Sequence, residues 1–272
     1  MNIKLIAMLA VLFIVTQSIG LMVADKLIQE NVSATLITDN PEDVENSIGL
    51  IAYILVFTAV LLIAIKYFGN FSGILFKIFE SLAIFGASIL VFYTFTQTIF
   101  VFVFALLLVL VRIVFSKNIW LRNLSSVIAT AGAGALMGVS LGILPVIVFM
   151  VLLAIYDFIA VFKTKHMITL ANAIKKKNLS FTYALPTKEH QFELGTGDLV
   201  IPLVFSTSIL KANKALMNFP EYFFPSAIIL TVSFIGLIAT IYFVSKKPGK
   251  ALPALPLQVM LMVLVYGLMQ LL

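Results

Sequence analysis

The chain has 272 residues, of which 62% are hydrophobic and 11% charged, and its mean hydropathy is +1.14. This composition lies far from that of a soluble domain and predicts a polytopic membrane protein. The net charge of +6 does not indicate a nucleic-acid partner, because the basic residues are scattered beside apolar runs. The absence of cysteine excludes disulfides, thiolate metal sites and cysteine catalysis.

Nine transmembrane helices are predicted in chain order if about 20 apolar residues form one span. The expected spans are 3–24, 48–68, 71–95, 98–115, 123–142, 145–163, 197–212, 223–245 and 251–271. The first run is kept as a span because it is too long for the apolar region of a signal peptide. We expect an all-α membrane protein with one domain, made of a six-helix part (1–163), a cytoplasmic connection (164–196) and a three-helix part (197–272).

The distribution of lysine and arginine predicts the orientation. If the amino terminus is cytoplasmic, fourteen of these residues lie on the cytoplasmic side, and only Lys26, Lys211 and Lys214 lie outside. The first external loop, 25–47, is rich in acidic residues. We therefore expect an integral, multi-pass membrane protein with a cytoplasmic amino terminus and an external carboxy terminus.

Two aspartates lie inside predicted spans, where a charged side chain is costly and therefore indicates function. Asp157 precedes Lys163 by six residues in the sixth span, which is about 9 Å along a helix. Asp198 follows Glu193 by five residues, at a comparable depth in the seventh span. Because these two spans run antiparallel, both carboxyl groups are expected at one level of the membrane.

A facing pair of carboxylates is the arrangement that aspartyl proteolysis needs. The pair shares one proton, so the ionised carboxyl activates water while the protonated one polarises the scissile carbonyl. Asp157 and Asp198 are the expected catalytic residues, and no cofactor or metal is expected. Alternatively, each aspartate only pairs with a lysine or caps a helix. The rival function is a proton-coupled transporter with the same pair as a proton relay.

Three short motifs resemble those of the presenilin and signal-peptide-peptidase family of intramembrane aspartyl proteases, in its microbial form. Tyr156-Asp157 is similar to the family's YD motif on the sixth helix. Gly195-Thr196-Gly197-Asp198 is similar to its GxGD motif on the seventh, and Pro253-Ala254-Leu255 to its PAL motif at the start of the ninth. The resemblance implies a presenilin-like fold and an intramembrane aspartic endopeptidase. It leaves the branch open, since PALP resembles presenilin and GDLVIP resembles signal peptide peptidase.

The resemblance also implies the partners. Substrates are expected to be transmembrane-helix proteins cleaved within or near the lipid bilayer, and nucleic acid is not expected. Partner subunits are not expected to be required, and a homo-oligomer stays open. The expected substrate-binding or site-shaping residues are Tyr156, Gly195, Gly197, Pro253, Ala254 and Leu255.

Residue type suggests physical roles for some of these positions. Gly195 and Gly197 allow unusual backbone conformations or close approach of a substrate backbone, although an ordinary loop end explains them equally. Pro253 and Pro256 remove amide donors near a helix start, in a segment that by resemblance holds an extended substrate. Tyr156 either forms a hydrogen bond near the two aspartates or only packs within the membrane helices.

The cytoplasmic connection contains two segments, 181–185 and 191–194, whose loose alternation predicts β-strands. A helical substrate must unwind before cleavage, because its own hydrogen bonds occupy the scissile carbonyl. Strands beside the site would let the unwound segment pair by strand addition. On this hypothesis, proline at Leu185 and Leu194 impairs cleavage.

Other intramembrane features are predicted to be structural. Lys77 and Glu80 are three residues apart and are expected to pair on one helix face. Arg112 is expected to extend its charge to the membrane surface. The small residues in 129–135 are expected to allow close helix packing. Because HExxH and GxSxG motifs are absent, zinc and serine intramembrane proteases have no basis in the sequence.

Overall fold

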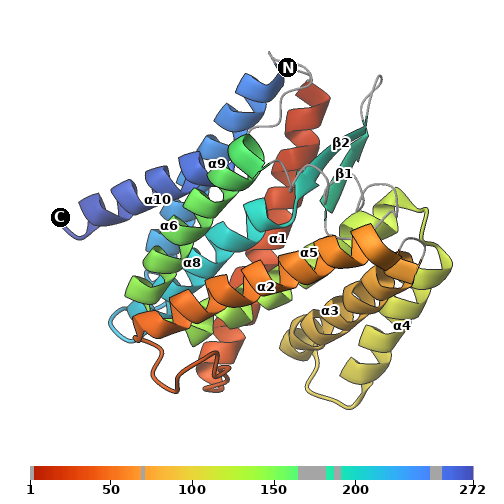
Figure 1. Cartoon of the computed structure of the whole chain (residues 1–272). Helices are drawn as coiled ribbons and strands as arrows, with labels where there is room; N and C mark the ends of the chain where they lie inside the picture. The colour runs from red at the N-terminus through yellow and green to blue at the C-terminus, as the bar shows by residue number, and fades with distance from the viewer. Residues whose placement is uncertain (1–2, 69–70, 165–181, 187–190, 246–252, 272) are drawn as a thin grey trace.

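The computed structural model describes residues 3–68, 71–164, 182–186, 191–245 and 253–271. Within these residues the chain forms nine α-helices, one short π-helical turn and one β-hairpin (Figure 1). The elements are α1 (Ile3–Gln29), α2 (Val44–Phe68), α3 (Phe71–Phe95), α4 (Phe100–Val114), α5 (Ile119–Ser140), α6 (Ile143–Ile159), η1 (Ala160–Thr164), β1 (Thr182–Pro186), β2 (Gln191–Gly195), α8 (Gly197–Lys214), α9 (Phe223–Ser245) and α10 (Leu255–Met269).

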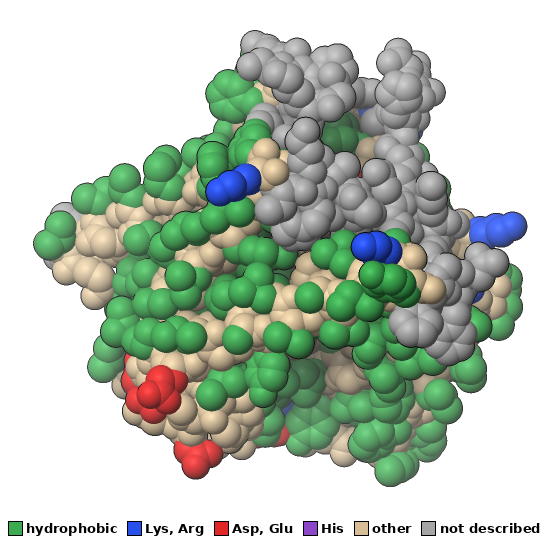
Figure 2. Space-filling model, in the orientation of Figure 1, with side chains coloured by type: hydrophobic (Ala, Val, Ile, Leu, Met, Phe, Trp, Pro, Cys, Tyr) green, Lys and Arg blue, Asp and Glu red, His purple; other side chains and the backbone are tan. Residues whose placement is uncertain are grey.

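The nine helices follow the nine predicted spans, with ends that differ by a few residues. Six of them are long and apolar enough to cross a membrane, and α4 and α10 are shorter apolar helices. Hydrophobic side chains dominate the face shown in Figure 2. The prominent acidic side chains there lie along the lower edge, and the prominent basic ones lie in the upper half. These features identify an integral membrane protein, because a soluble surface would mix charge over its whole area.

Helix α8 lies at the centre of the helix bundle. It packs against α1, α5, α6, α9 and α10, and every residue in 201–210 is buried. Its polar residues Ser206, Thr207 and Ser208 therefore bond to neighbouring backbone carbonyls rather than to water or lipid. Helix α8 carries Asp198, so its central position places the start of that helix inside protein.

Small residues on α5 allow its neighbours to approach closely, as predicted. A side chain at Gly132 would collide with the backbone carbonyl of Ala87 on α3. A side chain at Gly134 would reach within 2.7 Å of Leu203 on α8. Helix α5 therefore joins the central helix to the lateral pair formed by α3 and α4, which pack on each other.

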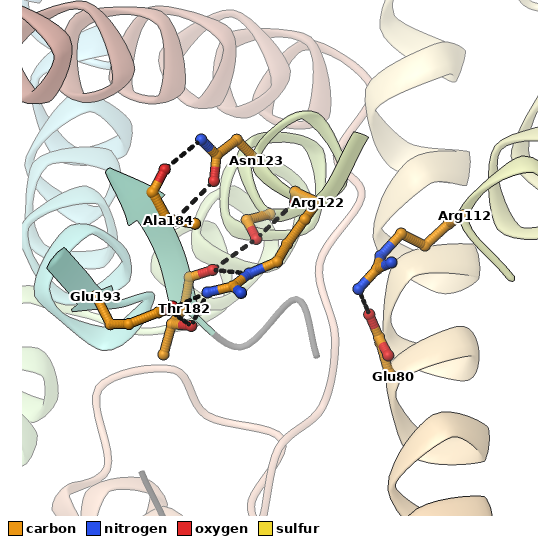
Figure 3. Close-up of polar contacts among 8 residues, drawn as sticks. Glu80, Arg112, Arg122, Asn123, Thr182, Ala184 and Glu193 are labelled. Carbon is orange, nitrogen blue, oxygen red and sulfur yellow. Dashed lines mark hydrogen bonds and ion pairs between the residues drawn. The ribbon is translucent and has the colours of Figure 1, made fainter. Parts of the chain in front are cut away.

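The predicted pairing of Lys77 with Glu80 is wrong. Glu80 is buried and binds the guanidinium of Arg112 at 3.1 Å, across the contact between α3 and α4 (Figure 3). Arg112 does not extend to the surface either, because it is only 4% exposed and also donates to the carbonyl of Ser116 at 2.7 Å. A buried arginine needs a counter-charge from whichever helix lies beside it, and spacing along one helix does not reveal that neighbour.

The two predicted strands are confirmed. β1 and β2 form an antiparallel hairpin in which Tyr183 lies opposite Leu194 and Leu185 opposite Phe192. Tyr183, Leu185 and Leu194 are buried in one cluster with Leu199 of α8. Only Thr196 separates β2 from α8, so the hairpin leads directly into the first turn of the central helix.

Candidate active site

Asp157 lies near the carboxy-terminal end of α6, two residues before the helix gives way to η1. Its side chain is half-buried, while its neighbour Phe158 is exposed on the outer surface of the bundle. Asp157 is therefore more protected by the protein than its neighbour on the outer surface.

Asp198 is the second residue of α8 and is also half-buried. The first turn forms around the carbonyl of Thr196, which accepts from the N–H groups of Leu199 at 3.1 Å and Val200 at 2.9 Å. An acidic residue in a first turn is favoured by the helix dipole. Thr196, and not Asp198, occupies the N-cap position.

Helices α6 and α8 pack on each other, and the two aspartates lie at the ends that face the hairpin. Both aspartates thus lie on helices that contact each other directly. Among the residues that the structure describes, neither carboxyl forms an ion pair or a hydrogen bond with another side chain. The structural alternative of a lysine partner for each aspartate therefore finds no support in this part of the chain.

The Pro253-Ala254-Leu255 segment lies against both aspartate-bearing helices. Ala254 is the N-cap residue of α10 and belongs to the cluster formed by the hairpin and Leu199 of α8. Leu255 begins α10 and packs in a second cluster with Ala154 of α6. Pro256 occupies the first turn of α10, where a missing N–H costs little, so the helix-start interpretation of this proline is confirmed.

The two glycines of the GxGD motif have different surroundings. A Cβ at Gly195 would lie 3.6 Å from a carboxyl oxygen of Asp198, whereas a Cβ at Gly197 would meet nothing within 4 Å. Neither glycine adopts a left-handed backbone conformation. A left-handed turn is therefore not what these glycines provide where the strand passes into the helix. A Cβ at Gly195 would make only an ordinary van der Waals contact, so the close approach of a substrate backbone and an ordinary loop end both stay open.

Tyr156 is half-buried on α6, which packs against α2. The adjacent Asp157 interacts with it electrostatically. Whether Tyr156 forms a hydrogen bond near the aspartates or only packs therefore stays a prediction.

The hairpin is held on α5 by two polar residues that the sequence analysis treated as unremarkable (Figure 3). Asn123 donates its Nδ2 to the carbonyl of Ala184 and accepts from the Ala184 N–H with Oδ1, both at 2.8 Å. Arg122 donates to the Thr182 carbonyl at 3.2 Å and forms an ion pair with Glu193 on β2. Arg122 is one of the fourteen basic residues expected on the cytoplasmic side, but it is 2% exposed and therefore acts inside the fold.

Two buried glutamines near Asp198 were also missed. Gln17 of α1 donates to the Leu199 carbonyl at 2.9 Å, and Gln258 of α10 donates to the Asp198 carbonyl at 3.3 Å. The available signal was an amide inside an apolar run, as in PLQVMLMV around Gln258. A buried amide must find partners, so such a residue indicates an internal polar contact.

Comparison with known proteins decides the family. The family described as "Signal-peptide peptidase, presenilin aspartyl protease" matches residues 10–267 of this chain. The chain belongs to this family. The resemblance inferred from the YD, GxGD and PAL motifs is therefore confirmed, and membership of the signal-peptide peptidase and presenilin family favours a protease over the proton-coupled transporter.

Two solved structures share the presenilin-like fold. One is described as a presenilin family intramembrane aspartate protease in the C222 space group. It has a TM-score of 0.66 and 22% identity, and the match covers 95% of this chain and 94% of that chain. The other, described in the same words for the P2 space group, has a TM-score of 0.62 and 26% identity, with 95% and 96% covered. Among curated proteins, no significant match was found.

Proposed function

We propose that this chain is an intramembrane aspartic endopeptidase whose catalytic pair is Asp157 and Asp198. The observation that carries the proposal is the packing of α6 on α8, the two helices that bear these aspartates. Neither carboxyl has another side-chain partner in the described residues. Family membership supports the same conclusion. If the aspartates were only structural, each carboxylate would be expected to pair with a lysine or arginine side chain.

The proposed reaction is hydrolysis of a peptide bond within or near a transmembrane helix. The ionised carboxyl of the pair takes a proton from a water molecule, and the water oxygen bonds to the scissile carbonyl carbon. The protonated carboxyl donates a hydrogen bond to the carbonyl oxygen. When the tetrahedral intermediate breaks its carbon–nitrogen bond, a proton passes to the leaving amine, and the pair returns to one shared proton.

We propose that a substrate helix docks on the apolar groove between α6 and α10. This groove has a volume of about 380 Å³ and is lined by Phe158, which follows Asp157, and by Pro256, which follows Leu255. Pro253, Ala254 and Leu255 then contact the unwound segment beside the aspartates. An apolar groove open to lipid suits a helix that arrives from the membrane.

An unwound substrate would add as a strand to β2. The outer edge of β1 is occupied by Asn123, which bonds both backbone groups of Ala184. No strand pairs with the other edge of β2 among the described residues. Because Leu185 and Leu194 are buried, proline there would also disturb the core, so the sharper test uses the substrate. N-methylation of alternate backbone amides on one side of the scissile bond should reduce kcat/KM in an alternating pattern.

We also propose the orientation expected from the sequence, with the amino terminus cytoplasmic and the carboxy terminus external. The fourteen-to-three distribution of basic residues supports it. The division into 1–163, 164–196 and 197–272 as parts of one membrane domain accompanies this proposal. A cysteine at Asp39 and another at Lys163 would respond to an impermeant thiol reagent from opposite sides.

The deciding experiment uses the purified chain in liposomes with a single-span substrate. Asp157→Asn and Asp198→Asn should each lower kcat/KM by at least about a hundredfold. Asp39→Asn, at an exposed aspartate far from the pair, serves as the matched control and should cleave normally. A hydroxyl-bearing mimic of the tetrahedral intermediate should inhibit. Full activity in either variant would refute the assignment of the pair.

A further inference from the structure

Pro202 interrupts the hydrogen bonding of α8 next to Asp198. In a regular helix, the N–H of residue 202 would bond to the carbonyl of residue 198. Proline has no N–H, and its ring crowds the carbonyl four residues earlier. The Asp198 carbonyl therefore lacks its helical donor, at the start of a helix that is otherwise enclosed by protein. A buried carbonyl without a donor is destabilising.

Gln258 supplies the missing donor from another helix. Its side chain is fully buried, and its Nε2 lies 3.3 Å from the Asp198 carbonyl oxygen. The same Nε2 reaches Ser233 of α9, with its carbonyl at 3.4 Å and its hydroxyl at 3.3 Å. The amide has two hydrogens, so it can bond α8 and α9 together.

Gln258 is also tied to the segment that contains the PAL motif. Its backbone N–H donates to the carbonyl of Ala254 at 3.3 Å. A continuous chain of contacts therefore runs from Ala254 through Gln258 to the backbone of Asp198. The neighbouring carbonyl, that of Leu199, receives a similar bond from the buried amide of Gln17 at 2.9 Å. Side-chain amides from α1 and α10 thus donate hydrogen bonds to two backbone carbonyls in the first turn of α8.

We propose that Gln258 is a positioning residue that replaces the amide missing at Pro202 and so links the 253–255 segment to Asp198. The expected effect of Gln258 on catalysis rests on the proposed function. The hydrogen bond between Gln258 and the Asp198 carbonyl does not depend on that function. Without the Gln258 amide, the first turn of α8 must shift to find another donor. The Asp198 carboxyl belongs to the residue that moves, so its alignment with Asp157 changes while the substrate-binding surfaces remain.

A four-member cycle tests this link: the wild type, Gln258→Leu, Pro202→Ala and the double variant. Alanine at position 202 restores the N–H that can bond to the Asp198 carbonyl. Thermal unfolding of the purified protein needs no peptidase activity. Gln258→Leu should lower Tm by about 5 °C, and Pro202→Ala in the same chain should recover at least half of that loss.

The kinetic form of the cycle reports on Asp198 itself. Gln258→Leu should lower kcat about tenfold with KM within about twofold, and the double variant should recover most of kcat. Ser233→Ala removes only the contact with a hydroxyl on α9 and should change kcat little. Gln270→Leu, at an exposed glutamine that follows α10, is the matched control and should change neither Tm nor kcat.

Two results would overturn the proposal. If Gln258→Leu lowers Tm equally with proline or alanine at position 202, Gln258 acts through Ser233 and not through the Asp198 carbonyl. If it leaves both Tm and kcat unchanged, the bond has no role. A failure of the proposed function would give a different result, because Asp198→Asn would then still cleave the substrate. The Tm values of the four variants would in that case still show whether Gln258 bonds to the Asp198 carbonyl.

Discussion

Asn123 on α5 bonds both backbone groups of Ala184 on β1 through its side-chain amide, with both distances at 2.8 Å. An amide side chain can occupy a strand edge in this way because it presents a donor and an acceptor side by side, as a neighbouring strand does. The hairpin is thereby docked on the helical bundle, and the β1 edge is closed to other strands (Figure 3).

Asn123→Leu should loosen the hairpin. Ala184 is fully buried, so its N–H and carbonyl would lose their partners in an apolar setting, at a cost of about 1–3 kcal/mol. Hydrogen exchange measured over 182–186 should become faster. Asn118→Ala is the matched control on the same helix, since it removes the N-cap bonds to Trp120 and Leu121. It should lower stability by about 1 kcal/mol without selectively exposing the hairpin. Unchanged exchange in Asn123→Leu would contradict the docking role.

The ion pair between Arg122 and Glu193 should show strong coupling. Both side chains are largely buried, at 2% and 15% exposure. Arg122→Met removes the guanidinium that binds the largely buried Glu193 carboxylate, so it should cost about 3–5 kcal/mol of unfolding free energy. Adding Glu193→Leu should recover part of this loss. The pair formed by Lys26 and Glu30 is the control, because both side chains are about a quarter exposed and Lys26→Met should have a much smaller effect. Additive losses for Arg122 and Glu193 would argue against coupling.

The pair formed by Arg112 and Glu80 should behave in the same way inside the lateral helix pair. Arg112→Met alone should destabilise strongly, because Glu80 is only 6% exposed and would lose the guanidinium that binds its buried carboxylate. Arg112→Met combined with Glu80→Leu should be closer to the wild type, since apolar residues of similar size suit this contact. Denaturant unfolding in detergent measures the difference. A double variant less stable than either single one would contradict this account.

Gly132→Ala should destabilise the contact between α3 and α5. The added methyl group would overlap the backbone carbonyl of Ala87, and a backbone atom cannot move aside as a flexible side chain can. We expect a loss of about 1–3 kcal/mol in unfolding free energy. Gly86→Ala is the matched control, because nothing lies within 4 Å of its Cβ position and alanine favours the helix. Equal stability of the two variants would show that the close approach is unimportant.

Several features of the fold could be predicted from the sequence alone. Apolar runs of membrane length predicted the nine helices, and alternation in 181–185 and 191–194 predicted the two strands, although not their pairing as a hairpin. These signals are local, since one helix or strand records its own surroundings in the period of its side chains. The YD, GxGD and PAL motifs indicated the family for a similar reason, because each is a short run of residues in a fixed order.

The polar partners could not be predicted. Glu80 was assigned to Lys77 but binds Arg112, and Arg122 was assigned to orientation but binds Glu193. Gln258 meets Asp198 across 60 residues of chain. A polar group within a bundle bonds to whichever helix packs beside it, and that neighbour depends on how the whole set of helices is arranged. The sequence by itself determined which segments form helices, which form strands and to which family the chain belongs. Only the tertiary structure decided the polar partners, because a hydrogen bond or ion pair requires two groups within about 3 Å and spacing along the chain does not set that distance.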